Sequence, residues 1–102
     1  VDAMLAAVLE GLPPAQLAGH VHDTEGRALE NVSVALRRGL RVFDAAVGGL
    51  GGCPYAPGAA GNVATEALLA HVEDRGFATG LDAGRVAKAA EMARAMRMGA
   101  TA

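Results

Sequence analysis

The sequence predicts an α/β fold in which helices alternate with parallel strands. Two apolar stretches, residues 17–21 and 40–47, are expected to form short strands, the second of them apolar on both faces. Helical periodicity precedes and follows each stretch. Strands that are buried on both faces and separated by helices are typical of a parallel sheet covered by helices.

The first two helices are expected on either side of the first strand. Apolar residues spaced three and four apart predict an amphipathic helix over residues 1–12, which Pro13 and Pro14 end. Asp23 and Thr24 are residue types that favour the N-cap of the second helix. This helix is expected over residues 25–38.

Two further helices are expected after the second strand. A third helix over residues 64–75 ends at Gly76, and Asp82 can cap a fourth. The fourth helix is expected to carry a row of residues along one side, namely Val86, Ala89, Ala90, Ala93 and Met96.

Length and composition narrow the class of protein. A chain of 102 residues with 52% hydrophobic and 20% charged residues is typical of one small globular domain. The net charge of −2, with acids and bases interspersed, argues against nucleic acid or an anionic membrane as a partner. No apolar run approaches the roughly 20 residues of a membrane helix. The single cysteine fits a reducing compartment.

His20 and His22 are the first candidate site residues. They lie two apart on a predicted strand, so both side chains point to the same face. Two imidazoles on one face suit a divalent metal ion. The alternative is that one histidine is a satisfied polar group and the other is exposed.

Asn62 and Cys53 are the other candidates. The amide oxygen of Asn62 is a hard, neutral donor for a metal ion, although asparagine also favours the N-cap of the helix that follows. Cys53 lies in a stretch with six glycines among residues 48–61, where a thiol would meet reactants. It could equally be an inert small side chain.

Three motifs together resemble the 3-hydroxy-3-methylglutaryl-CoA lyase family. They are His20-Val21-His22-Asp23, Gly49-Leu50-Gly51-Gly52-Cys53-Pro54-Tyr55-Ala56 and Gly61-Asn62-Val63-Ala64-Thr65-Glu66. The resemblance implies a (β/α)₈ TIM barrel, which typically takes about 250 residues. Residues 1–102 would form the C-terminal part of this single domain: the last two strands with their helices, plus a trailing helix.

The resemblance also implies a chemistry. The family cleaves a carbon–carbon bond of 3-hydroxy-3-methylglutaryl-CoA, which yields acetyl-CoA and acetoacetate. By resemblance, His20, His22 and Asn62 are ligands of a divalent metal, Mg or Mn, and Cys53 is the catalytic residue that transfers a proton. The family's fourth ligand is an aspartate of the first barrel strand. Neither Asp23 nor Asp44 matches its motif, and both are expected to act beside the ligands or in structure.

The same resemblance implies a setting for the protein. It predicts an acyl-CoA substrate, a homo-oligomer such as a dimer, and a role in leucine catabolism and ketone body metabolism. The expected location is the cytoplasm of a bacterium, or the mitochondrial matrix in a eukaryote. Two alternatives stay open: a metal-dependent barrel enzyme of the isopropylmalate or homocitrate synthase type, or a fragment that needs the rest of the barrel. The isolated 102-residue chain is expected to be inactive.

Charged residues outside these motifs are expected on the surface. His71 is predicted to face solvent from the middle of the third helix, and Arg27 to have a surface role. The basic side chains between Arg85 and Arg97 are predicted to form a solvated helix face.

Overall fold

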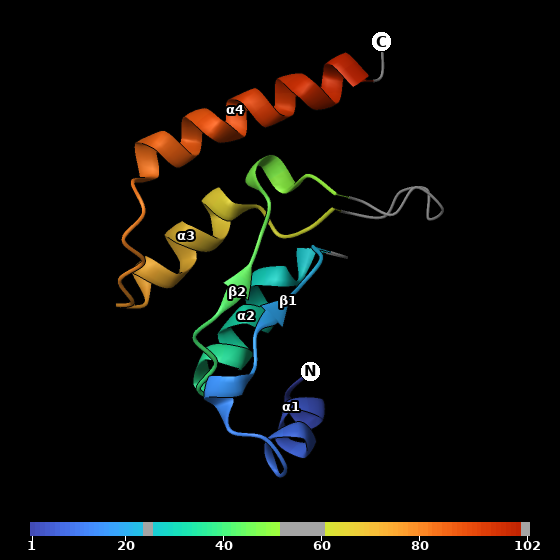
Figure 1. Cartoon of the computed structure of the whole chain (residues 1–102), viewed down its shortest axis with the longest axis vertical. Helices are drawn as coiled ribbons and strands as arrows, with labels where there is room; N and C mark the ends of the chain where they lie inside the picture. Colours follow the sequence, from blue (N-terminus) through green and yellow to red (C-terminus); the bar gives the residue numbers. More distant parts are fainter. Residues whose placement is uncertain (24–25, 52–60, 101–102) are drawn as a thin grey trace.

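The computed structural model describes residues 1–23, 26–51 and 61–100, with the side chains of residues 97–100 left aside. The described elements follow the order predicted from the sequence, with helices alternating with strands and two helices at the end (Figure 1). No helix in these ranges is long and apolar enough to cross a membrane. In chain order the elements are α1 (Asp2–Leu9), η1 (Pro14–Gln16), β1 (Gly19–His20), α2 (Ala28–Arg37), β2 (Phe43–Asp44), η3 (Val47–Gly49), α3 (Thr65–Asp74) and α4 (Ala83–Ala100).

Strands β1 and β2 are parallel neighbours, as the sequence predicted, and α2 lies in the connection between them. Gly19 pairs with Phe43 and His20 pairs with Asp44. A Cβ atom on Gly19 would lie 2.5 Å from the Phe43 ring, so the ring packs against the bare backbone of the neighbouring strand. Only glycine at position 19 leaves room for this ring.

The strands are shorter than the predicted stretches, because a third segment separates them. Val21 and Asp23 exchange backbone hydrogen bonds with residues 61–63, while Ala46 bonds to Val63 and Thr65. The same segment forms an antiparallel bridge at Asn62 and a parallel bridge at Ala64. Residues 61–64, which we call the wedge segment, therefore occupy the space where β1 and β2 would otherwise continue to pair. The prediction had assigned this segment to a loop and a helix start.

Asp82 caps α4 as predicted, whereas the N-cap of α2 is Arg27 and not Asp23. Asp23 Oδ1 accepts a hydrogen bond from the Ala28 N–H at 3.2 Å, at the start of α2. Asp82 Oδ1 accepts one from the Arg85 N–H at 3.0 Å, at the start of α4. Gly76 follows α3 with a φ of 89°, the left-handed conformation that favours glycine after a helix.

Two apolar clusters hold the helices against the strands. One joins α1 to α2 through Leu5, Ala35 and Leu40. The other joins α2 to α3 and contains Val32, Leu36, Val72, Val21, Phe43, Leu68 and Phe77. Because Phe43 contacts both clusters, β2 connects the two halves of the core.

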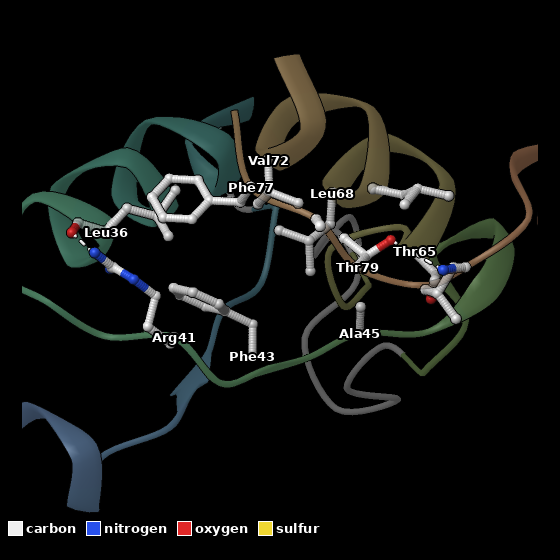
Figure 2. Close-up of a pocket in the computed structure, with 12 residues that line it drawn as sticks. Leu36, Arg41, Phe43, Ala45, Thr65, Leu68, Val72, Phe77 and Thr79 are labelled. Carbon is white, nitrogen blue, oxygen red and sulfur yellow. Dashed lines mark hydrogen bonds between the residues drawn. The ribbon is translucent and has the colours of Figure 1, made fainter. Parts of the chain in front are cut away.

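A cavity of about 450 Å³ lies beside the second cluster, between β2, α3 and the segment that follows α3 (Figure 2). Its walls are mostly apolar, and Arg41 closes one end. The Arg41 guanidinium stacks 4.6 Å from the centre of the Phe77 ring and donates to the backbone oxygens of Leu36 and Leu40. Stacking on an aromatic ring stabilises a guanidinium that also satisfies backbone acceptors.

One surface prediction is wrong. His71 does not simply face solvent: its Nε2 atom hydrogen-bonds to Ser33 Oγ at 2.7 Å, across the contact between α2 and α3. Met96 is 64% exposed, because α4 packs through Ala90 and Ala93 and Met96 lies beyond this contact. Arg94 is 55% exposed, as predicted for the basic side chains of this helix, and it also pairs with Glu66 on α3. Sequence periodicity cannot supply such partners, which lie 28 and 38 residues away.

Leu40→Ala should lower the free energy of unfolding by about 2–5 kcal/mol, because it empties a buried site. Leu40 is 3% exposed, whereas Leu12 is 44% exposed. Leu12→Ala is therefore the matched control, and it should change stability far less. Urea unfolding followed by circular dichroism measures both variants. Equal losses would show that Leu40 is not a core residue.

His71 should make the fold less stable in mild acid. Burial, aided by the nearby charge of Arg75, lowers the pKa of His71 below its ordinary value of 6.5, against a weaker opposing effect of Asp74. The unfolded chain therefore binds this proton more readily, and stability falls as the pH drops below about 6.5. Urea unfolding between pH 7.5 and pH 5 (about the range in which histidine titrates) should show a shallower decline for His71→Gln. An unchanged decline would remove His71 as its cause.

Candidate functional site

His20 is held by a carboxylate on the neighbouring strand. Its Nδ1 atom lies 2.5 Å from Asp44 Oδ1, and both side chains are more than half exposed. The pair follows from the strand register, which places His20 opposite Asp44. An ionised carboxylate only accepts hydrogen bonds, so Nδ1 donates to Asp44, and Nε2 is the ring nitrogen that a ligand could reach. The expectation that Asp44 supports a ligand histidine agrees with this contact.

His22 lies beside His20, as the two-residue spacing predicted. The ring centres are 5.2 Å apart and the planes meet at 76°. This separation is compatible with both rings facing one ion, because each imidazole can offer one nitrogen. His22 is exposed, so its ring is open to a ligand.

Asn62 is brought to His22 by the backbone of the wedge segment. The two residues form an antiparallel bridge, although they are 40 positions apart in the sequence. The Asn62 side chain donates from Nδ2 to the Leu50 backbone oxygen at 3.1 Å. Its Oδ1 atom is buried and has no hydrogen-bond partner among the residues that the structure describes. A buried, unpartnered amide oxygen is unfavourable unless something binds it, so it marks Asn62 as a candidate ligand rather than a simple helix cap.

Glycines leave the space that this asparagine occupies. A Cβ atom on Gly51 would lie 2.7 Å from Asn62 Nδ2, and one on Gly49 would lie 3.3 Å from the Asn62 backbone oxygen. Both glycines have positive φ, 91° and 71°. A larger residue at position 51 would therefore be strained and would also displace the asparagine amide.

The described part of the chain holds two imidazoles and one amide near each other, but no group of three His, Cys, Asp or Glu side chains placed to hold a metal. Cys53 lies in residues 52–60, outside the described residues. Asp23 bonds to the start of α2 and Arg27 is exposed, so neither extends the site. The convergence of His20, His22 and Asn62 on one point stays a prediction.

The donor set matches the chemistry of a divalent cation. Two imidazole nitrogens and an amide oxygen suit ions of intermediate to hard character. A carboxylate that fixes the second nitrogen of a ligand histidine is the usual outer partner at such sites. The α/β fold and this donor set point to the class of α/β proteins that bind a divalent metal ion, with the candidate ligands at the end of β1 and in the wedge segment.

Comparison with known proteins identifies the family to which the chain belongs. The family model described as HMGL-like matches residues 1–93, and the chain belongs to that family. The hydroxymethylglutaryl-CoA lyase of Pseudomonas mevalonii is 58% identical over 77 residues, which are 76% of this chain and 26% of that enzyme. The chain thus spans about a quarter of the length of the curated relatives it matches. Some matched relatives are named as cytoplasmic and others as mitochondrial.

Solved structures agree with the family. The chain is similar to the HMG-CoA lyase of Brucella melitensis, with a TM-score of 0.90 and 57% identity, over 95% of this chain and 34% of that one. It is also similar to an HMG-CoA lyase described as from Acenitobacter baumannii, in complex with coenzyme A and 3-methylmalate. There the TM-score is 0.82 and the identity 42%, over 92% of this chain and 31% of that one.

Replacing His22 should weaken the binding of Mn²⁺ to a protein that contains this chain. We expect His22→Ala to lose more than the roughly 10–100-fold that removal of an outer partner costs, because a donor atom itself is lost. His71→Ala is the matched control, since His71 bonds to Ser33 and lies outside the candidate site. Titration followed by Mn²⁺ electron paramagnetic resonance measures both. Equal affinities would exclude His22 as a ligand.

Proposed function

We propose that this chain carries the metal ligands and the catalytic cysteine of a hydroxymethylglutaryl-CoA lyase. The reaction would cleave the carbon–carbon bond of 3-hydroxy-3-methylglutaryl-CoA and yield acetyl-CoA and acetoacetate. The observation that carries the proposal is the Asn62 side-chain oxygen beside the His22 backbone, which is buried and has no partner within the described ranges. Identities of 58% and 57% to named lyases support the same reaction.

His20, His22 and Asn62 would hold a divalent metal, Mg or Mn. The Asp44 contact leaves Nε2 of His20 as the donor, and the Leu50 contact leaves Oδ1 of Asn62 as the donor. A bound metal would act as a Lewis acid toward substrate oxygens and as a template for the substrate. All three protein donors are neutral, so a carboxylate from another part of the barrel would supply compensating charge.

Cys53 would move the proton that the cleavage requires. Removal of the substrate's hydroxyl proton lets the carbon–carbon bond break, which leaves acetoacetate and the enolate of acetyl-CoA. The enolate carbon then takes up a proton, and a thiol can supply it. Exclusion of water during this step protects the enolate.

The proposed place of the chain is the C-terminal part of a TIM barrel. Within the described ranges, β2 has a ladder partner only in β1, and the cavity of Figure 2 lies along β2 and α3. An apolar cavity of this kind can take side chains from the remaining barrel. The complex of a similar lyase with coenzyme A supports an acyl-CoA substrate, and we propose a homo-oligomer such as a dimer.

A chimeric lyase tests the reaction. Residues 1–102 replace the matching segment of the Brucella melitensis lyase, and acetoacetate release is measured with Mg²⁺ or Mn²⁺. We expect cleavage that stops when the metal is chelated and in His22→Ala. A folded chimera that binds Mn²⁺ without cleaving the carbon–carbon bond of the substrate would reject the proposal. Condensation of acetyl-CoA with a 2-oxo acid would instead favour the isopropylmalate or homocitrate synthase type.

Cys53→Ala in the same chimera should lower kcat by about 10²–10⁴-fold, the usual range for one acid–base group. The thiol is not among the proposed ligands, so Mn²⁺ affinity should stay within about twofold of the parent, the ordinary spread for an uncoupled site. The control is Cys53→Ser, which keeps the size of the side chain but not its acidity. Near-normal turnover in both variants would assign Cys53 a structural role.

A further inference from the structure

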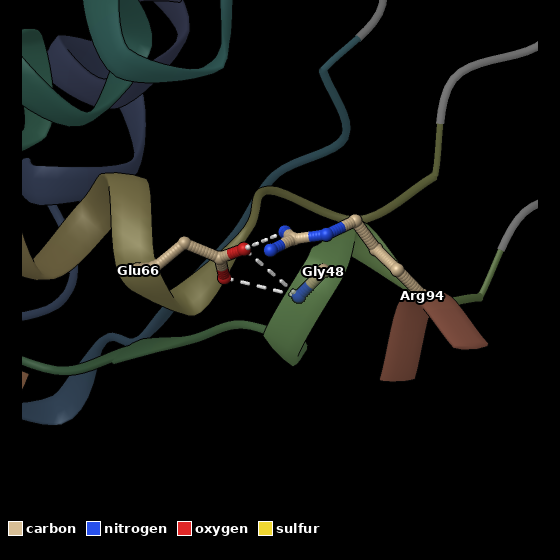
Figure 3. Close-up of polar contacts among 3 residues, drawn as sticks. All are labelled: Gly48, Glu66 and Arg94. Atoms are coloured by element: carbon tan, nitrogen blue, oxygen red, sulfur yellow. Dashed lines mark hydrogen bonds and ion pairs between the residues drawn. The ribbon is translucent and has the colours of Figure 1, made fainter. Parts of the chain in front are cut away.

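Glu66 joins three parts of the fold through one carboxylate. Its two oxygens accept the Gly48 N–H at 3.0 and 3.2 Å, and Oε2 also accepts from Arg94 Nη1 at 3.2 Å (Figure 3). Glu66 lies in the first turn of α3, Gly48 in η3, and Arg94 on α4. Hydrogen bonds to an ionised group are about twice as strong as neutral ones, so this contact fixes η3 to both helices.

The turn that Glu66 holds has little freedom to move toward α4. Gly48 has a φ of 66°, and a Cβ atom there would lie 3.3 Å from both the Ala90 backbone oxygen and the Ala93 side chain. Gly48 therefore packs with its bare backbone against α4. The carboxylate of Glu66 holds Gly48 in this position by accepting its N–H.

The same turn leads directly to the Asn62 side chain. Leu50 follows η3, and its carbonyl oxygen accepts the hydrogen bond from Asn62 Nδ2. A carbonyl accepts hydrogen bonds only, so it selects the amide nitrogen and turns Oδ1 the other way. The position of the Leu50 carbonyl thus decides that Oδ1, and not Nδ2, is the Asn62 atom that can bind a metal ion.

We infer that Glu66 and Arg94 are positioning residues that orient the Asn62 amide through residues 47–50. The inference deepens the proposed function, since it rests on Asn62 being a ligand. Glu66 acts on Gly48, the turn carries the constraint to Leu50, and Leu50 orients Asn62. Arg94 holds the carboxylate in place from α4, which gives this trailing helix a part in forming the site.

The first test uses the 102-residue chain without metal. Asparagine occurs only at positions 31 and 62, so ¹⁵N-asparagine labelling gives two side-chain amide signals, and Asn31→Ala assigns them. In Glu66→Gln the Asn62 amide protons should exchange with solvent about tenfold faster, the scale of one lost hydrogen bond. Arg94→Gln should have a smaller effect in the same direction, and Arg94→Lys should restore the parent rate.

Arg85→Gln is the matched control, because Arg85 lies on α4 with an exposed side chain. It should leave the Asn62 signal unchanged. Circular dichroism confirms that each variant is folded, and Arg94→Gln keeps the test decisive if Glu66→Gln unfolds, since Arg94 is 55% exposed. An Asn62 signal that is the same in folded Glu66 and Arg94 variants overturns the inference.

The second test measures Mn²⁺ affinity in the chimeric lyase. Glu66→Gln should weaken it about tenfold, as expected for a partner outside the ligand shell; Arg94→Gln should weaken it less, and Arg94→Lys should keep the parent affinity. Unchanged affinity together with a faster-exchanging Asn62 amide overturns the positioning role. A parent that binds no Mn²⁺, while the Asn62 amide still responds to Glu66, rejects the proposed metal site and supports the orientation of Asn62 by Glu66.

Discussion

The backbone pairing of the wedge segment is the interaction on which the candidate site depends. Residues 61–64 bond on one side to residues 21–23 and on the other to Ala46. Without these bonds, Asn62 would have no fixed relation to His22, and the start of α3 would have no fixed relation to β2. Backbone hydrogen bonds do not depend on side-chain type, so the motif residues are free to serve chemistry.

The surrounding packing supports this pairing from outside the site. Val63 is 2% exposed and lies next to Asn62, so the wedge segment is fixed by a buried apolar residue beside a polar one. The helices α2 and α3 meet through Val32, Leu36 and Val72. Ser33 and His71 form a hydrogen bond across the same contact. This bond fixes how the two helices lie relative to each other, because a hydrogen bond requires a narrow range of geometry. The polar residues of the candidate site therefore lie at the edge of this apolar packing.

Local pattern was sufficient to predict much of the fold. Periodicity predicted the four helices, and Asp82 predicted where α4 begins, whereas α2 begins at Ala28 and not directly after Asp23. The two-residue spacing of His20 and His22 predicted adjacent rings, because alternation along a strand is a local property. The wedge segment was not predicted, since Gly61 and Asn62 are types depleted in strands and their pairing partners lie about 40 residues earlier.

Polar contacts between residues far apart in the sequence were not predicted either. Nothing near Glu66 in the sequence indicates that Gly48 and Arg94 meet its carboxylate, and Ser33 gives no local sign of His71. The role of Asp44 was partly foreseen from its place in a strand, but the register that sets it against His20 came from the structure. Contacts of this kind depend on how elements pack, which periodicity alone does not determine.

The proximity of Gly51 and Asn62 affects which insertions and deletions the chain can tolerate in evolution. The two flanks of residues 52–60 are fixed beside each other, by the Leu50 carbonyl on one side and by the pairing of Gly61 with Asp23 on the other. The entropy of closing such an interval depends weakly on its length, and a doubling costs only about 0.6 kcal/mol. A change in the length of this interval therefore costs little stability and leaves the pairing of the wedge segment in place, provided that Cys53, the proposed proton-transfer residue, is kept.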